Sequence, residues 1–220
     1  MGYYLAPTRD ELKLAKHYMK YLKRVGVHLG LSNLVTMGTI KFLGKGAERK
    51  VYSIEGIDGF VLKVDRTDYD KCNGFRCRLE CYVYREALKE GWEEYFVPAY
   101  YLGKIGNTTF SLQYRVNVWE DNAYEKLCEY IDSNPGTFEY YYSYDEDETY
   151  VNYAEAISDM SDYEIANVLL DGVGYRFGDF LDNYNVNDLH QGNFGTDEYG
   201  NFLIVDYCGY RTSSETPHKW

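Results

Sequence analysis

Residues 40–64 constrain the fold more than any other part of the chain. They read IKFLGKGAERKVYSIEGIDGFVLKV, which is three short apolar runs separated by turns that contain glycine. Short runs rich in Val, Ile, Phe and Tyr and bounded by glycine are typical of β-strands. The segment therefore predicts an antiparallel β-meander, and the rest of the chain must fold around a sheet.

Two further elements of the N-terminal half can be predicted from their patterns. Residues 8–25 begin with a capping Thr8 and carry apolar side chains at helical spacing, which predicts a helix. We expect the glycines after residue 25 to end that pattern. Residues 76–90 predict a second helix, and residues 96–116 predict a β-hairpin that turns at Gly106-Asn107.

The second half of the chain is predicted to be mostly helical. Residues 119–148 are acidic and rich in tyrosine, and the DEDE run at 145–148 indicates a solvated loop or the tip of an insertion. Helices are expected at 150–160 and 162–182, followed by a last hairpin in TDEYGNFLIVDY.

The predicted fold class is α+β, with two parts that divide where the strands give way to helices. Residues 1–116 would form a β-rich part with an N-terminal helix, and residues 117–220 a mostly helical part that carries the last hairpin. A chain of 220 residues is long enough for one large domain or for two small lobes.

Composition excludes some classes of partner. The formal net charge of −12 argues against general nucleic-acid binding and against binding to an anionic membrane surface, because both need Lys and Arg. No run of 18 apolar residues and no signal-peptide core are present, so we expect an intracellular, cytoplasmic protein. Cys72, Cys77 and Cys81 lie close together in the sequence, but a packing role is favoured over a zinc site.

The segment that carries most of the chemistry is DLHQGN, residues 188–193. Asp206 follows thirteen residues after Asn193, at the end of the apolar run FLIVD. Magnesium prefers oxygen ligands and takes one or two carboxylates together with phosphate oxygens. Asn193 and Asp206 can supply such ligands, and Asp188 can stand beyond the metal and orient a hydroxyl for attack. His190 is interpreted as holding the loop by hydrogen bonds to backbone carbonyls, in preference to a contact with the metal or phosphate region, because magnesium prefers oxygen ligands.

This arrangement resembles the catalytic and metal-binding loops of the protein-kinase-like superfamily. The DLHxGN form is similar to that of aminoglycoside and choline phosphotransferases and of small bacterial and phage-encoded kinases. The resemblance implies that Asp188 is the catalytic base or orients the substrate, that Asn193 is a magnesium ligand and that Asp206 is the principal magnesium ligand. It further implies ATP and Mg²⁺ as cofactors, a two-lobed fold, and the cytoplasm of a bacterium or of a phage-infected host.

The N-terminal half resembles the same superfamily in a second motif. LGKGAERKVY, residues 43–52, is similar to the glycine-rich loop that covers the phosphates of ATP. Glycines such as Gly44 and Gly46 let backbone N–H groups approach a phosphate without an intervening side chain. The resemblance implies that Val51 packs on the adenine and that residues around Val116 form the hinge that meets it.

A third motif resembles the strand that carries the phosphate-binding lysine of the superfamily. This motif is FVLKV, residues 60–64, and the lysine would be Lys63. The following helix offers Glu80 or Glu86 as its partner, and Glu80 is preferred because it lies earlier on the helix.

The chain departs from the superfamily pattern at several positions. Arg49 stands where the third loop glycine is expected, and Val186-Asn187 stands where protein kinases place a His or Arg before the catalytic Asp. Only fourteen residues follow Asp206, which predicts a truncated C-terminal lobe without an activation segment or peptide-docking site. These departures leave the phosphate acceptor open.

The function favoured by these motifs is transfer of the γ-phosphate of ATP to a hydroxyl, preferably that of a protein Ser or Thr. A small cationic alcohol of the aminoglycoside or choline type is an alternative acceptor. Transfer of AMP in place of phosphate is a further alternative. The remaining one is an inactive pseudokinase or acidic binding module that occupies a nucleic-acid-binding partner, consistent with the negative charge.

Overall fold

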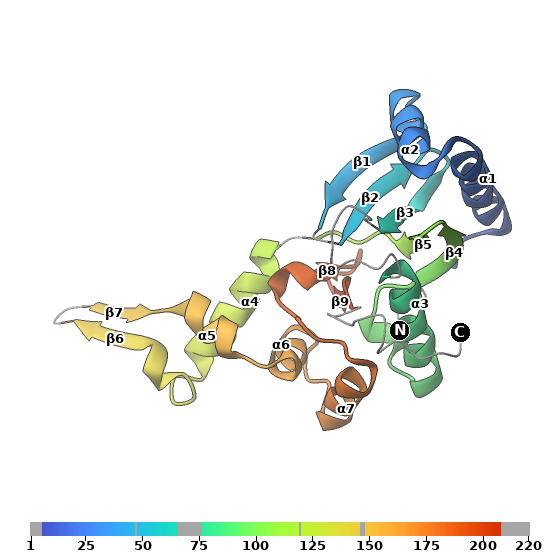
Figure 1. The fold of residues 1–220 in the computed structure, drawn as a ribbon. Coiled ribbons are helices and arrows are strands. Elements are labelled where there is room, and N and C mark those ends of the chain that lie inside the picture. Colours follow the sequence, from blue (N-terminus) through green and yellow to red (C-terminus); the bar gives the residue numbers. More distant parts are fainter. Residues whose placement is uncertain (1–5, 47, 66–75, 119, 146–147, 208–220) are drawn as a thin grey trace. The chain divides into compact units, whose positions relative to one another are not determined.

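The structure is a computed structural model that describes residues 6–46, 48–65, 76–118, 120–145 and 148–207. It is a mixed α+β fold, as predicted, and divides into two compact units between Arg115 and Val116. We call these the N-terminal unit and the C-terminal unit. Figure 1 labels their elements.

The helices are α1 (Arg9–Val25), α2 (Val27–Thr36), α3 (Arg76–Glu90), α4 (Glu120–Ser133), α5 (Tyr153–Asp159), α6 (Asp162–Leu169) and α7 (Tyr175–Tyr184), with short 3-10 helices η1 (Glu93–Tyr95), η2 (Glu139–Tyr141) and η3 (Gln191–Asn193). The strands are β1 (Ile40–Lys45), β2 (Arg49–Ile54), β3 (Ile57–Asp65), β4 (Ala99–Ile105), β5 (Thr108–Tyr114), β6 (Tyr142–Asp145), β7 (Glu148–Val151), β8 (Phe194–Thr196) and β9 (Phe202–Ile204).

The N-terminal unit is built on a five-stranded antiparallel sheet in the order β1-β2-β3-β5-β4. The meander predicted for residues 40–64 is confirmed as β1, β2 and β3, and the predicted 96–116 hairpin is confirmed as β4 and β5. In the register of the sheet, Lys63 lies between Val51 on β2 and Ser111 on β5. Because directly opposite residues share a face, these three side chains lie in one row.

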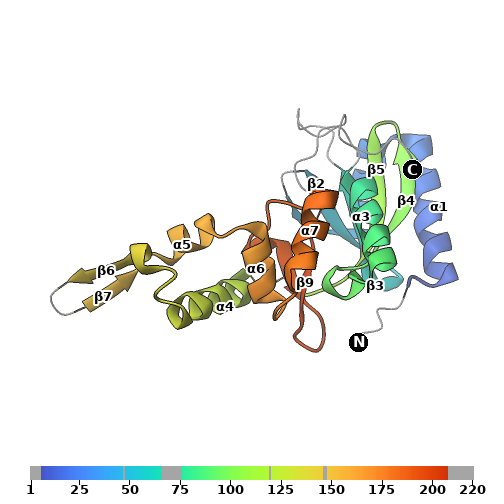
Figure 2. The same cartoon turned by 90° about the horizontal axis from the view of Figure 1, so that it is seen from below.

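The two faces of this sheet differ in chemistry. One face is apolar and packs against α1 and α2, with Leu22, Leu34, Leu62 and Phe110 in a single buried cluster. The opposite face carries polar side chains that are nevertheless buried; they are Arg49, Lys63, Asp65, Thr109, Ser111 and Gln113. Helix α3 covers this polar face, and Figures 1 and 2 show α1 and α3 on opposite sides of the sheet. A buried polar face needs partners, since an unpaired buried polar group costs stability.

Helix α1 confirms the prediction for residues 8–25. Thr8 caps it, and the Thr8 side chain and Glu11 form a reciprocal capping box. The expectation that glycines end the helical pattern after residue 25 was wrong in part, because α2 starts at Val27. Gly26 has φ of 87° and redirects the chain, whereas Gly30 lies inside α2 against Leu22, where a Cβ would come within 2.6 Å of the leucine Cδ2. Gly30 is therefore a close-packing position between two helices.

The C-terminal unit contains α4 to α7 and two small hairpins (Figure 2). The single helix predicted for 162–182 was wrong, since the chain forms α6 and α7 with a break between them. Asp171, Gly172 and Gly174 all have positive φ in this break, which no continuous helix accepts. Ser161 caps α6 through a second capping box, with Glu164.

The acidic stretch 119–148 is more ordered than its composition indicated. It contains α4, whose Ala123, Leu127 and Ile131 recur at four-residue spacing and are fully buried. It then enters the β6–β7 hairpin, in which Asp145 and Glu148 form the last pair of the two strands. This pairing agrees with the insertion tip, and not with the loop, that the sequence suggested for these two residues. Residues 146 and 147 lie outside the described residues. One tyrosine of this stretch binds a carboxylate, since Tyr141 Oη donates to Asp159 Oδ2 at 2.7 Å.

The last hairpin, β8–β9, is confirmed and pairs Phe194 with Ile204. Within the described ranges, no helix combines the length and the apolar composition needed to cross a bilayer.

Candidate functional site

In the N-terminal unit, the glycine turn between β1 and β2 presents open backbone. Gly44 pairs with Val51 across the strands, and the N–H of Gly46 donates to the carbonyl of Arg49 at 2.9 Å. A Cβ built on Gly44 or on Gly46 would meet nothing within 4 Å, and neither residue has a positive φ. The fold itself therefore does not require glycine at either position, whereas close approach of a ligand to the backbone would.

Lys63 and Glu80 form a buried ion pair on the polar face of the sheet. Lys63 Nζ lies 2.9 Å from Glu80 Oε1, and the two side chains are 6% and 0% exposed. The alternative partner, Glu86, binds Lys89 Nζ at 2.8 Å instead. The structure thus brings together the lysine and the glutamate preferred from the sequence.

Arg49, which replaces the expected third glycine, is a second cation at this pair. Its Nη1 lies 2.8 Å from the same Glu80 Oε1, and the side chain is buried. Nearby, Asp65 accepts hydrogen bonds from the Cys77 N–H and the Thr109 hydroxyl, and so fixes the start of α3 against β3 and β5. Arg49 is therefore directed at Glu80 and adds a second positive charge beside Lys63.

In the C-terminal unit, Asp188 has a left-handed backbone with φ of 64°. This conformation is uncommon for a residue with a side chain, and such strain clusters at functional sites. The side chain is exposed, while Leu189 beside it is buried. Contacts from several directions hold the strained residue in place.

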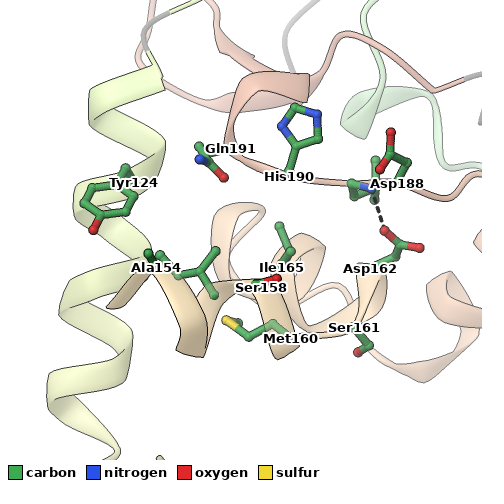
Figure 3. Close-up of a pocket in the computed structure, with 12 residues that line it drawn as sticks. Tyr124, Ala154, Ser158, Met160, Ser161, Asp162, Ile165, Asp188, His190 and Gln191 are labelled. Atoms are coloured by element: carbon green, nitrogen blue, oxygen red, sulfur yellow. Dashed lines mark hydrogen bonds between the residues drawn. The ribbon is translucent and has the colours of Figure 1, made fainter. Parts of the chain in front are cut away.

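Asp162, the first residue of α6, supplies one of these contacts. Its Oδ1 accepts the N–H of Leu189 at 2.5 Å, drawn as the dashed line in Figure 3, and it also accepts a backbone hydrogen bond from Asp188. Burial raises the pKa of the Asp162 carboxyl, although these two backbone hydrogen bonds act to lower it. Nothing in the sequence pattern pointed to Asp162 as a contact of this loop.

Asn193 supplies the second contact and links the loop to Asp206. Its Nδ2 donates to the carbonyl of Asp188 at 2.7 Å, and its own carbonyl accepts from the N–H of Val205 at 2.8 Å. The chain thus places Asp188, Asn193 and the residue before Asp206 in one hydrogen-bonded segment. His190 contacts the backbone of its own loop, as expected, but with a backbone N–H in place of a carbonyl: its Nδ1 accepts the N–H of Gly192 at 3.1 Å.

The donor set of this segment fits magnesium. Because the Nδ2 of Asn193 is committed to Asp188, its Oδ1 is the atom left for a cation. Asp206 brings a carboxylate to the residue after Val205, whose N–H binds the Asn193 carbonyl. Across the part of the chain that the structure describes, no three His, Cys, Asp or Glu side chains group as metal ligands. Magnesium needs fewer protein ligands than that, since it keeps waters and phosphate oxygens in its shell.

A cavity of about 600 Å³ adjoins this loop within the C-terminal unit. Figure 3 shows Asp188 at one end of it and Tyr124 of α4 at the other, with Met160 on the side opposite His190 and Gln191.

The remaining sequence candidates lie as follows. Val116 begins the C-terminal unit, where its side chain lies close to Gly195; a Cβ on that glycine would come within 2.7 Å of Val116 Cγ2. Cys72 lies outside the described residues. Burial raises the pKa of both the Cys77 and the Cys81 thiols well above their usual value, which keeps them protonated and disfavours a zinc site.

No protein-family model matches the chain, and no curated protein matches it with significant similarity.

Proposed function

We propose that the chain is a kinase-like phosphotransferase that uses Mg-ATP and transfers the γ-phosphate to a hydroxyl group. The observation that carries the proposal is the buried Lys63–Glu80 pair on the sheet that also bears the open Gly44–Gly46 turn. A buried lysine held by a carboxylate, on a sheet whose glycine turn leaves room for a ligand to approach the backbone, is suited to binding the phosphates of a nucleotide.

The roles follow from the contacts described above. The Gly44–Gly46 backbone and Lys63 would bind the phosphates, and Val51, in the same row as Lys63, would contact the base. Asn193 and Asp206 would hold Mg²⁺, which neutralises charge on the phosphates. Asp188 would accept the proton of the attacking hydroxyl, and its strained backbone fixes where its carboxylate stands.

The proposal is tested by the thermal shift that Mg-ATP causes in the native chain and in the Asp206→Asn variant. At about 100 times Kd, binding adds roughly 2.7 kcal/mol to the free energy of unfolding. For a chain of this size, each kcal/mol raises Tm by about 2–4 °C. A rise of several degrees that requires magnesium and is lost in the variant supports the proposal.

Unchanged Tm at millimolar Mg-ATP would overturn the proposal. It would favour the alternative of an acidic binding module, for which the net charge of −12 is the motivating observation. That alternative expects capture of a basic partner to be unaffected by Asp188→Ala or Asp206→Asn.

A further inference from the structure

The cavity beside Asp188 has a composition that bears on the phosphate acceptor. It is formed by α4, by the segment from α5 to α6 and by the loop at 188–191. Five of its lining side chains are aliphatic or thioether groups: Ala154, Ile157, Met160, Ile165 and Leu189. Tyr124, Ser158 and Gln191 add neutral hydrogen-bonding groups. Ser161, Asp162, Asp188 and His190 complete the lining, so a ligand would meet apolar and polar surface in nearly equal parts.

The cavity has few charged side chains with which to bind a charged ligand. None of the described residues that line it is Lys or Arg, so nothing there favours an anionic acceptor. The two lining carboxylates are Asp162 and Asp188, and Asp162 is already bound to the backbone N–H groups of Leu189 and Asp188. Only the Asp188 carboxylate remains, and a polycation of the aminoglycoside type would need several such groups to replace its hydration.

The size of the cavity favours a small molecule over a protein side chain. Small-molecule sites typically enclose about 300–1,000 Å³ and combine apolar walls with a few polar groups. The cavity of about 600 Å³ falls within that range. A serine or threonine side chain would fill little of it and would leave Ile157, Met160 and Ile165 without a partner.

We propose that the cavity binds the phosphate acceptor, and that the acceptor is a neutral small alcohol with an apolar, ring-sized body. This inference rests on the proposed function. The hydroxyl lies at the Asp188 end and the body lies against Ile157, Met160 and Ile165. The hydroxyl oxygen forms a bond to the γ-phosphorus of ATP, the bond from that phosphorus to the β,γ-bridging oxygen breaks, and ADP leaves. The hydroxyl proton passes to the Asp188 carboxylate.

Met160 provides a readout that needs no turnover. The full chain has four methionines, so labelling with [methyl-¹³C]methionine gives a simple NMR spectrum, and Met160→Leu assigns the cavity signal. The probe is 2-phenylethanol, a neutral alcohol with an aromatic body, compared with choline and kanamycin at equal concentration. A fragment of this size binds in the millimolar range, so titration to about 20 mM suffices. The Met19 and Met37 methyls, which belong to the N-terminal unit, serve as internal controls.

We expect 2-phenylethanol to shift the Met160 signal saturably while choline and kanamycin leave it unchanged. Ser158→Trp, which fills the cavity, should abolish the response. A Met160 response to either cation but not to the alcohol would overturn the proposed class, and so would no response to the alcohol. Both comparisons use the native protein and hold even where the Trp variant does not fold. Loss of the Mg-ATP thermal shift with an intact Met160 response would remove the proposed function and leave the alcohol site.

Discussion

Asp162 at the start of α6 binds the backbone N–H of Leu189, which lies 27 residues later in the chain, at 2.5 Å. The contact connects a helix N-terminus to the loop that carries Asp188, and it acts on the one catalytic candidate whose backbone is strained. Under the proposed function Asp162 is a positioning residue, since it binds the loop and would act through Asp188.

Replacement of Asp162 by Ala should lower phosphate transfer more than nucleotide binding. The change leaves two backbone N–H groups without their acceptor, at a cost of about 1–3 kcal/mol each, and frees Asp188 to leave its left-handed conformation. Asp162→Asn keeps one acceptor oxygen and should retain more activity. The measurement is kcat and the Mg-ATP thermal shift for both variants. Equal activity of the Ala variant and the native chain would contradict the positioning role.

The same carboxyl makes a pH prediction whose sign is fixed by its raised pKa. In the folded state Asp162 holds its proton to higher pH than the value of 3.8 that it has when unfolded. Its ionisation therefore costs stability as pH rises from below 3.8 through the folded pKa. The native chain should lose stability relative to Asp162→Asn over this window. Urea unfolding of both proteins at a series of pH values measures the difference, and parallel curves would refute it.

Replacement of Glu80 by Gln should destabilise the N-terminal unit strongly. Lys63 and Arg49 both lie within 2.9 Å of the same oxygen, so the change removes a carboxylate that two buried cations share. Breaking a buried ion pair from one side costs about 3–5 kcal/mol. Asp10→Asn is the matched control, because the Asp10–Lys13 pair is exposed and should contribute under about 1 kcal/mol. Chemical denaturation of both variants tests the contrast.

Gly44→Ala should lower the affinity for Mg-ATP and keep stability, whereas Gly30→Ala should lower stability and keep the affinity. A Cβ on Gly44 meets nothing, so this variant should keep its stability within about 0.5 kcal/mol and lose affinity for Mg-ATP. A Cβ on Gly30 meets Leu22 at 2.6 Å, and such overpacking costs about 1–3 kcal/mol. Nucleotide affinity per folded molecule should be unchanged in the Gly30 variant. Unaltered Mg-ATP affinity in the Gly44 variant would argue against a phosphate-binding turn.

Cys77 and Cys81 should resist alkylation in the folded protein. Burial raises both pKa values well above the usual one, and only the thiolate reacts. Mass-spectrometric peptide mapping after iodoacetamide treatment at pH 8, with and without denaturant, measures their protection. Rapid modification of either residue before unfolding would contradict the buried packing role.

Local signals predicted much of this fold because they act within a few residues. The Thr8 capping box, the meander and both hairpin turns are specified by side chains next to one another in the sequence. Helix α2 was missed because Gly26 and Gly30 have the composition of a break, and only the packing of Leu22 against Gly30 explains the second glycine. Helix α4 was missed because its acidic surface masked the spacing of its buried residues, Ala123, Leu127 and Ile131.

The candidate site likewise contains residues that local motifs predict and residues that only long-range contacts identify. Lys63, Glu80, Asp188 and Asn193 carry motifs that can be recognised from residue type and order. Asp162 and the lining of the cavity depend on contacts between distant helices and a loop, and such contacts leave no local pattern. Arg49 was noticed as a departure at the turn, but its ion pair with Glu80 follows only from the sheet register.

The unequal faces of the N-terminal sheet have a consequence for folding. A shift of β3 by one residue against its neighbours would place Lys63 and Asp65 among the side chains of Leu22, Leu34 and Phe110, and would turn Leu62 and Val64 toward Glu80. Such a misaligned strand would bury two charges in hydrocarbon and lose the aliphatic contacts as well. The ion pair that is proposed to bind nucleotide therefore also specifies the register of the strands.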